Sequence, residues 1–228
     1  VLLGSTIKFD GRLVLQARGN GQLSLLMSEF TSAGEVRGIA RYQDAPAGES
    51  FSDLIGTGTL VITVDSRRGD PYQGVVALES SELAECLQDY FRQSEQLASC
   101  FIFAADSGRV SAMMLQQLPA QLERDPALRA EQWQHAMHLA RTLSQTELLT
   151  LDHETVLHRL YHEEALRLFD PRPVHYQCSC SRERTARALL AIGQAEVDSI
   201  VAEQGGVAIS CEFCGTEYNF GPGEIDQL

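Results

Sequence analysis

The sequence lacks a long apolar run, and this absence excludes a membrane-spanning helix of ordinary kind. A bilayer-spanning helix needs about 18 or more consecutive apolar residues, and no stretch of the chain approaches that length. No signal peptide is visible at the N-terminus. The first residue is Val1 rather than methionine, so we expect the chain to start inside a longer protein, with a segment missing before its first strand. We expect no membrane partner.

Positive charge is also scarce in this chain. There are 18 Lys and Arg residues against 31 Asp and Glu residues, which gives a formal net charge of −13 at pH 7. A protein that binds nucleic acid usually presents a basic patch to the phosphates. We therefore do not expect nucleic acid as a partner.

The sequence motifs that mark common enzyme classes are absent as well. We find no nucleophile elbow, no Walker A loop and no dinucleotide-binding fingerprint. The glycines are scattered and sit at expected turns rather than in a phosphate-binding loop. The prediction is that this protein is not an enzyme.

The first half of the chain predicts a sheet. Apolar and polar residues alternate through residues 5–78, for example at Leu13, Leu15 and Ala17, and this period of two is typical of strands with one buried face. Gly19-Asn20-Gly21 predicts a hairpin turn, because Asn and Gly tolerate positive φ. A helix after residue 80 and strands at 100–105 and 110–115 follow. We predict an α+β fold with an antiparallel-sheet domain and packed helices over residues 1–122.

The next segment has a helical pattern. Residues 126–169 carry apolar residues at helical spacing, and we predict a helix from His153 to Leu168 within them. Asp170-Pro171-Arg172-Pro173 breaks helix and marks a boundary. The expected organisation is a helical linker over residues 123–174 and a small C-terminal four-cysteine zinc domain over residues 175–228.

Four of the six cysteines occur in two short clusters near the C-terminus. They are Cys178-Ser-Cys180 and Cys211-Glu-Phe-Cys214-Gly215. Two close pairs at long separation predict a four-thiolate zinc site, because zinc prefers a tetrahedron of soft ligands. The second pair has the form of a zinc knuckle, in which Gly215 permits a tight backbone turn. The prediction is one zinc ion per chain, held by Cys178, Cys180, Cys211 and Cys214.

The spacing leaves two roles open for this zinc site. In the first, zinc only holds together a domain too small to bury much core. In the second, the site is a redox switch, because zinc keeps the thiols as thiolates, the form that oxidants attack. Oxidation would then remove the ligands and unfold the domain. Thiols clustered at metal spacing favour a reducing, cytoplasmic compartment.

Other reactive side chains have simpler interpretations. His158 and His162 are four apart on a predicted helix, but their order does not match the zincin motif, so surface or packing histidines are the favoured reading over a metallohydrolase site. Cys86 and Cys100 are expected to be small buried hydrophobes. The apolar run at Met113 and Met114 is expected to be core, although methionines also suit an adaptable binding surface.

The cysteine pattern resembles the signature of a known family. Cys178-Ser-Cys180-Ser-Arg-Glu-Arg184 followed by Cys211-Glu-Phe-Cys214 is similar to the zinc-switch signature of the 33-kilodalton heat-shock chaperone family, the bacterial redox-regulated holdases. The resemblance spans nearly the whole chain. Further matching stretches are Val36-Arg-Gly38, Tyr72-Gln-Gly-Val75, Leu83-Ala-Glu-Cys-Leu87, Leu115-Gln-Gln-Leu-Pro119 and Leu160-Tyr-His-Glu-Glu164.

The resemblance implies a redox-regulated, ATP-independent molecular chaperone. Its reduced, zinc-bound form would be inactive, with Cys178, Cys180, Cys211 and Cys214 as ligands. Oxidation would pair Cys178 with Cys180 and Cys211 with Cys214, release zinc, unfold the C-terminal domain and destabilise the linker. The active form would bind unfolding client proteins, form a homodimer and pass its clients to ATP-driven chaperones when reducing conditions return.

A second hypothesis remains a structural zinc-ribbon module that binds a protein or nucleic acid through its zinc form. A third is a metallohydrolase centred on His158 and His162, which requires a second metal per chain. The acidic net charge of −13 opposes a nucleic-acid module. That charge also suits a protein that must stay dissolved while it exposes an apolar stripe of its linker helices to client chains.

Overall fold

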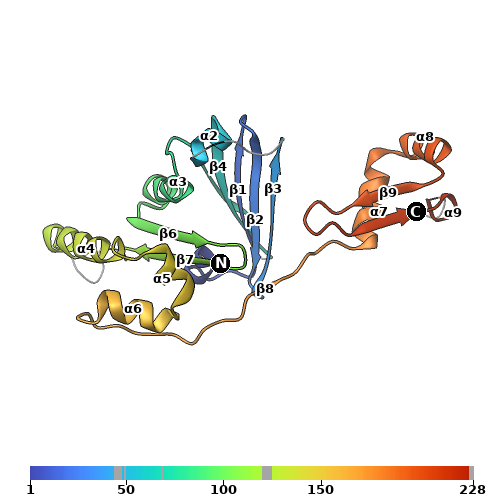
Figure 1. Ribbon diagram of the computed structural model, residues 1–228. Helices are drawn as coiled ribbons and strands as arrows, with labels where there is room; N and C mark the ends of the chain where they lie inside the picture. The colour runs from blue at the N-terminus through green and yellow to red at the C-terminus, as the bar shows by residue number, and fades with distance from the viewer. Residues whose placement is uncertain (44–47, 49, 68, 120–124, 226–228) are drawn as a thin grey trace.

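The computed structural model describes residues 1–43, 48, 50–67, 69–119 and 125–225 of the 228-residue chain. Figure 1 shows a sheet with helices on one side and, at its other edge, an extended segment that leads to a smaller C-terminal unit. The elements in chain order are α1 Leu2–Thr6, β1 Gly11–Gly19, β2 Leu23–Thr31, β3 Glu35–Tyr42, α2 Phe51–Ile55, β4 Gly58–Ser66, β5 Tyr72–Ala77, α3 Leu83–Tyr90, the π-helix η1 Phe91–Glu95, β6 Ser99–Ala105, β7 Val110–Gln116, α4 Pro126–Ala140, α5 Gln145–Thr150, α6 His153–Tyr161, β8 His175–Tyr176, α7 Arg182–Ile192, α8 Gln194–Gln204, β9 Val207–Ser210, β10 Glu217–Phe220 and α9 Pro222–Ile225.

The main sheet has six strands in the order β5-β4-β1-β2-β3-β8. The neighbours from β5 to β3 are antiparallel, whereas β8 joins the edge of β3 in parallel. Two further hairpins, β6–β7 and β9–β10, form two-stranded sheets. The predicted α+β class, with an antiparallel sheet and a C-terminal group of four cysteines, is confirmed.

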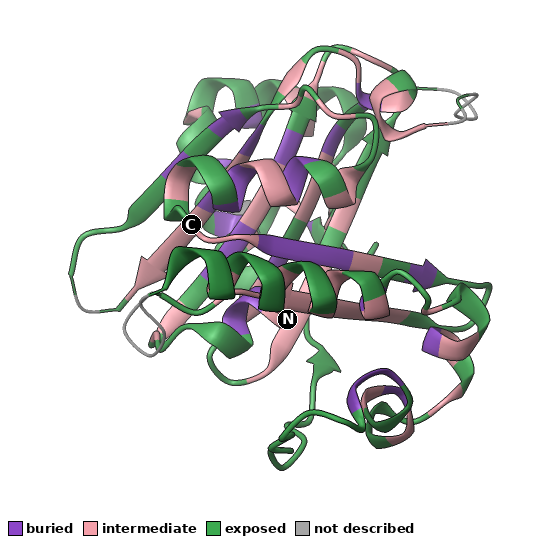
Figure 2. Ribbon diagram, turned by 90° about the vertical axis from the view of Figure 1, so that its left-hand side faces the viewer, coloured by how far each residue is buried: buried purple, intermediate pink, exposed green. Residues whose placement is uncertain are grey.

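The alternating residues predicted from the sequence do face the core. Leu13 and Ala17 of β1 are buried, Leu15 packs beside them, and they meet buried residues of α3 and β6. Figure 2 shows this burial along the strands behind α3 and along β6, whereas α4 is mostly exposed. The period of two therefore located the buried face of the sheet, as hydrophobic patterning predicts.

The hairpin between β1 and β2 forms where the sequence predicts it, but for a different reason. Neither glycine of Gly19-Asn20-Gly21 adopts positive φ. A methyl group on Gly19 would instead overlap the carbonyl oxygen of Ile55, and one on Gly21 would crowd the end of α2. Asn20 Oδ1 accepts a hydrogen bond from the amide of Thr57 at 2.9 Å. The glycines are therefore required by the close approach of α2.

This close approach predicts the effect of a single methyl group. The substitution Gly19→Ala should lower the free energy of unfolding by about 1–3 kcal/mol, because overpacking displaces the backbone. Gly108→Ala is the matched control, since the nearest atom to its methyl would be Asp106 Oδ1 at 3.9 Å. Urea unfolding of both variants measures the difference. Equal stability of the two would contradict the steric explanation.

The β6–β7 hairpin lies between the main core and the helices that follow it. Phe101 of β6 and Met114 of β7 pack with the main core. Met113 and Leu115, which alternate with Met114, pack instead with the buried residues Val156, Leu160 and Tyr161 of α6. We call this second set, together with its partly buried neighbours on α4 and on either side of α5, the linker layer. The methionines predicted as core thus serve two different layers.

The last helix predicted in the segment 126–169 is shorter than the sequence pattern predicts. The predicted helix from His153 to Leu168 ends at Tyr161. Beyond it, Leu166, Leu168 and Phe169 are 45%, 49% and 76% exposed. Most helical stability in proteins comes from packing an apolar face against another surface. The apolar residues after Tyr161 meet no such surface among the described residues, so the helix does not continue through them. The prediction failed because the periodicity cannot show where the partner surface stops.

The proposed division of the chain at residues 122 and 123 falls within 120–124, outside the described residues. The division after residue 174 stays a prediction, and β8 immediately after it pairs with β3 of the main sheet. Among the described residues, no helix has both the length and the apolar character needed to cross a bilayer.

Candidate metal centre

Two separate segments bring the four clustered cysteines together. Cys178 and Cys180 follow β8 and precede α7, while Cys211 and Cys214 lie in the turn between β9 and β10. The β9–β10 register pairs Ser210 with Glu217, so the hairpin presents the turn that carries the second pair. Each cysteine pair therefore sits on an ordered local element.

The second pair has a knuckle-like turn. The amide of Gly215 donates to the carbonyl of Cys211 at 2.7 Å, and the amide of Cys211 donates to Thr216 at 2.9 Å. Gly215 has φ of 71°, a left-handed conformation that residues with a Cβ rarely adopt. The expected role of Gly215 in a tight turn agrees with this geometry.

The first pair is fixed by the start of α7. The side chain of Ser181 caps the helix and accepts a hydrogen bond from the amide of Arg184. The guanidinium of Arg184 reaches back and donates to both the carbonyl and the hydroxyl of Ser179 at 2.8 Å. Ser179 is the single residue between the two cysteines, so the helix start positions both of their sulfurs.

The sulfur positions fit a tetrahedral metal site. The four Sγ atoms all lie within 4.8 Å of one another. Cys178 and Cys211 Sγ are 3.7 Å apart, and Cys180 and Cys214 Sγ are 3.4 Å apart. Four sulfurs about 2.3 Å from a zinc ion would be about 3.8 Å apart at the edges of their tetrahedron. All four cysteines are free thiols rather than disulfides.

The charges of the sulfurs point to the same conclusion. Hydrogen bonds with the hydroxyl and the backbone of Thr216 lower the pKa of Cys214 to about 6, and the neighbouring Cys180 contributes. The Tyr218 hydroxyl donates to Cys180 at 3.1 Å and favours its thiolate. Removal from water and the other three sulfurs outweigh that contact and raise the pKa of Cys180 to about 12. The four sulfurs can all be thiolates this close together only with a cation among them, and a divalent metal ion fits the donor set.

The rest of the C-terminal unit is small. Among its described residues, five form the buried core, which are Ala186, Leu189, Val197, Val207 and Phe220. So little buried apolar area gives little free energy of folding. The stability of this unit should therefore depend strongly on what the four sulfurs hold.

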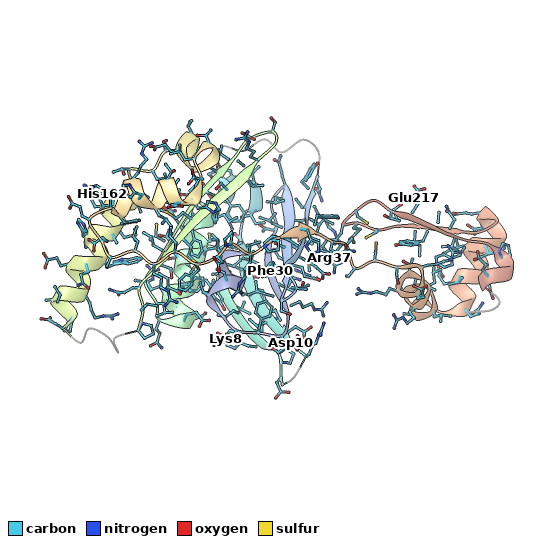
Figure 3. The ribbon with its side chains drawn as sticks, turned by 90° about the horizontal axis from the view of Figure 1, so that it is seen from below. Lys8, Asp10, Phe30, Arg37, His162 and Glu217 are labelled. Carbon is cyan, nitrogen blue, oxygen red and sulfur yellow. The ribbon has the colours of Figure 1, made fainter. Side chains whose placement is uncertain are left out.

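The other predicted reactive residues lie elsewhere. His158 and His162 have ring centroids 5.8 Å apart on exposed positions of α6 and its end, and Figure 3 shows His162 far from the C-terminal unit. Within the described part of the chain, only the four cysteines form a group of three or more ligands close enough to share a metal ion. Cys86 and Cys100 are buried as predicted, and burial raises the pKa of both thiols.

Sequence reasoning missed the residues around the cluster, including Thr216, whose hydroxyl lies 3.2 Å from Cys214 Sγ. Tyr218 donates to Cys180, Tyr176 donates to the carbonyl of Phe213 at 3.0 Å, and Arg37 of β3 lies 3.8 Å from Cys178 Sγ. The two tyrosines lie within a few positions of the cysteines, which is the only signal available. Nothing in the sequence links Arg37 to residues 141 positions later.

Comparisons with known proteins agree over nearly the whole chain. A family model described as "Hsp33 protein" matches residues 1–221. A "33 kDa chaperonin" of Ectopseudomonas mendocina is 51% identical, with 100% of this chain and 78% of that protein covered. The "33 kDa chaperonin" of Azotobacter vinelandii is 49% identical, with 100% and 77% covered. The crystal structure of the 33 kDa chaperonin (HSP33) of Thermotoga maritima matches with a TM-score of 0.82 at 26% identity, covering 99% of this chain and 80% of that chain.

The fold and the site define an α+β protein with a thiol cluster suited to a metal ion, built at the edge of an antiparallel sheet. The chain belongs to the Hsp33 protein family. This membership identifies it as a chaperone and indicates a non-enzymatic role, and the four-cysteine cluster fits redox-regulated metal binding.

Proposed function

We propose that this chaperone is an ATP-independent holdase whose client binding is switched on by oxidation of the thiol cluster. The observation that carries the proposal is the gathering of four free thiols at tetrahedral spacing in a unit with a very small core. A unit that depends on these thiols for its fold loses that fold when they are oxidised.

In the reduced form, Cys178, Cys180, Cys211 and Cys214 would hold one zinc ion. Zinc, when bound, supplies the positive charge that keeps the sulfurs as thiolates and joins the two cysteine-bearing segments. The chain itself contributes the knuckle turn at Gly215 and the helix cap at Ser181, which orient the sulfurs. While the C-terminal unit stays folded in this way, the chain would not bind clients.

Oxidation would pair Cys178 with Cys180 and Cys211 with Cys214. For each pair, two thiolates and one hydrogen peroxide give one disulfide and two hydroxide ions. Each sulfur loses one electron, and the O–O bond of peroxide breaks. A disulfide has no thiolate left to act as a metal ligand, so the two segments would separate and the C-terminal unit would unfold.

The apolar surface that receives clients would come from the linker layer. Val156, Leu160 and Tyr161 cover Met113 and Leu115 of β7 in the reduced fold. Unfolding of the C-terminal unit would free the C-terminal end of the linker. The linker helices would then detach from β7. The exposed apolar faces would then bind unfolding chains through the hydrophobic effect.

The partners proposed for the active form are unfolding client proteins, a second copy of the chain and ATP-driven chaperones that receive the clients. The cytoplasm, where thiols stay reduced until oxidative stress, is the proposed compartment. The net charge of −13 would keep the oxidised form dissolved while its apolar surface is exposed.

Light scattering from a heat-unfolding client protein tests this function. The zinc-loaded reduced chain should not suppress the scattering, whereas the same chain treated with peroxide at elevated temperature should suppress it at about equimolar ratio, because each chain exposes one linker layer. Zinc release is followed in parallel with a chromophoric chelator. Equal suppression by both forms would reject the switch, and suppression by neither would reject the holdase function.

A further inference from the structure

The main sheet contacts the thiol cluster through one buried arginine. Arg37 lies on β3 opposite Glu29 of β2, and their side chains form an ion pair at 2.8 Å with only 10% and 7% of their surfaces exposed. Burying two charges costs desolvation that their attraction does not always recover. The pair is therefore poorly explained as a device for stability alone.

The guanidinium of Arg37 also contacts the C-terminal unit. Its Nη1 donates to Cys178 Sγ at 3.8 Å, and its Cζ lies 4.1 Å from the centroid of the Phe213 ring. Phe213 sits between Cys211 and Cys214, so the Arg37 side chain contacts both of the segments that carry the cysteine pairs. Figure 3 shows Arg37 where the sheet meets the extension that carries this unit. Among the described residues, nothing accepts a hydrogen bond from its Nε.

Two other contacts join the same surfaces. Arg41 follows Ile39 by two positions on β3 and forms an ion pair with Glu212. Both side chains are more than half exposed, so solvent screens that pair. Tyr176 of β8 donates to the carbonyl of Phe213, while the amides of His175 and Gln177 donate to Gly34 and Val36 around β3. The thiol cluster, β8 and β3 therefore form one contact region centred on Arg37.

We propose that Arg37 is a positioning residue that docks the thiolate cluster on the edge of β3 and makes the pairing of β8 with β3 depend on the state of Cys178. This inference rests on the proposed redox function. Conversion of Cys178 and a second thiolate into a disulfide by peroxide, with release of two hydroxide ions, removes the negative sulfur that Arg37 faces. The buried guanidinium then loses the sulfur that accepts from Nη1, while its Nε already has no acceptor among the described residues, which disfavours the docked arrangement.

This contact would transmit oxidation of the cysteines to the linker through β8. β8 lies directly after residues 162–174, the extended segment that connects α6 to the C-terminal unit. While Arg37 holds the cluster, β8 stays paired and the extended segment is fixed at both ends. Release of β8 frees the end of the segment that lies nearest the cysteines, so the sheet edge responds to oxidation before the linker layer does.

Amide hydrogen exchange of the full chain tests the inference. The main variant is Glu29→Gln with Arg37→Gln, which removes both charges of the pair and leaves no lone buried charge. In the reduced, zinc-loaded state, the peptide covering His175 and Gln177 should exchange about tenfold faster than in the unchanged chain, because its strand pairing opens locally. Peroxide should raise exchange there in the unchanged chain and add little in the double variant.

Two control variants separate docking from general stability. Arg12→Gln removes an exposed ion pair with Asp65 on β1 and β4, two strands away from β3 in the same sheet, and should leave exchange at β8 unchanged. Arg37→Lys keeps a charge for Glu29 but cannot span Phe213 and Cys178 together, so exchange at β8 should stay fast. Full protection in Arg37→Lys would mean that Arg37 only neutralises Glu29, and would overturn the inference.

The outcomes also distinguish this inference from the proposed function. Faster exchange in β1 and β2 of the double variant would show a purely structural role for the pair, and would overturn the docking role. Unchanged exchange at β8 in the double variant would do the same. The scattering experiment on the unchanged chain decides the holdase function independently, because it involves no substitution at Arg37.

Discussion

Replacing Cys211 with serine is expected to abolish zinc binding and unfold the C-terminal unit. A serine hydroxyl is a poor ligand for zinc at neutral pH, and three remaining sulfurs do not complete the tetrahedron. Metal binding by four thiolates contributes apparent free energies of about 10–16 kcal/mol. The five buried residues around Leu189 and Phe220 cannot replace a contribution of that size.

The variant Cys211→Ser is measured by zinc content and by amide exchange across residues 178–225. We expect zinc to fall from one per chain to a small fraction, and exchange in α7 and β9 to become fast. Cys86→Ala is the control, because Cys86 is a buried cysteine on α3, outside the C-terminal unit. A folded C-terminal unit in Cys211→Ser would show that its fold does not depend on the metal.

Val156→Asp is expected to make the reduced protein bind clients. Val156 is 4% exposed and belongs to the linker layer that covers β7. An aspartate there would place an unpaired charge in an apolar contact, at a cost on the order of 3 kcal/mol or more. The buried part of this layer on α6 is small, three residues with partly buried neighbours around them, so a change of that size should detach the helices.

The matched control for this substitution is His158→Asp, which introduces the same charge at an exposed position two residues further along α6. Zinc-loaded, reduced Val156→Asp should suppress client scattering, while His158→Asp should behave like the unchanged chain. Amide exchange of α6 reports whether the helix has detached. Fast exchange without client binding would show that the linker layer is not the surface that receives clients.

Local patterns were sufficient for most of the fold. The alternation at Leu13, Leu15 and Ala17 placed the buried face of the sheet, because side chains on a strand have a period of two. The hairpin at Asn20 was also predicted, although the glycines beside it are required by α2 rather than by positive φ. The end of α6 was missed, because a stripe of apolar residues continues to Leu168 while the surface that could cover it does not.

The four cysteines were identifiable because ligand type and spacing are properties of the chain itself. Two close pairs of thiols define the edges of a tetrahedron wherever the chain brings them together, and the structure brings all four within 4.8 Å. Arg37 and Tyr176 could not be found in this way, since neither carries a spacing signal. Their roles arise when β8 adds to the edge of β3 and places the cluster beside Arg37. Long-range strand pairing, rather than any local pattern, creates that contact, and with it the connection between the thiol cluster and the sheet.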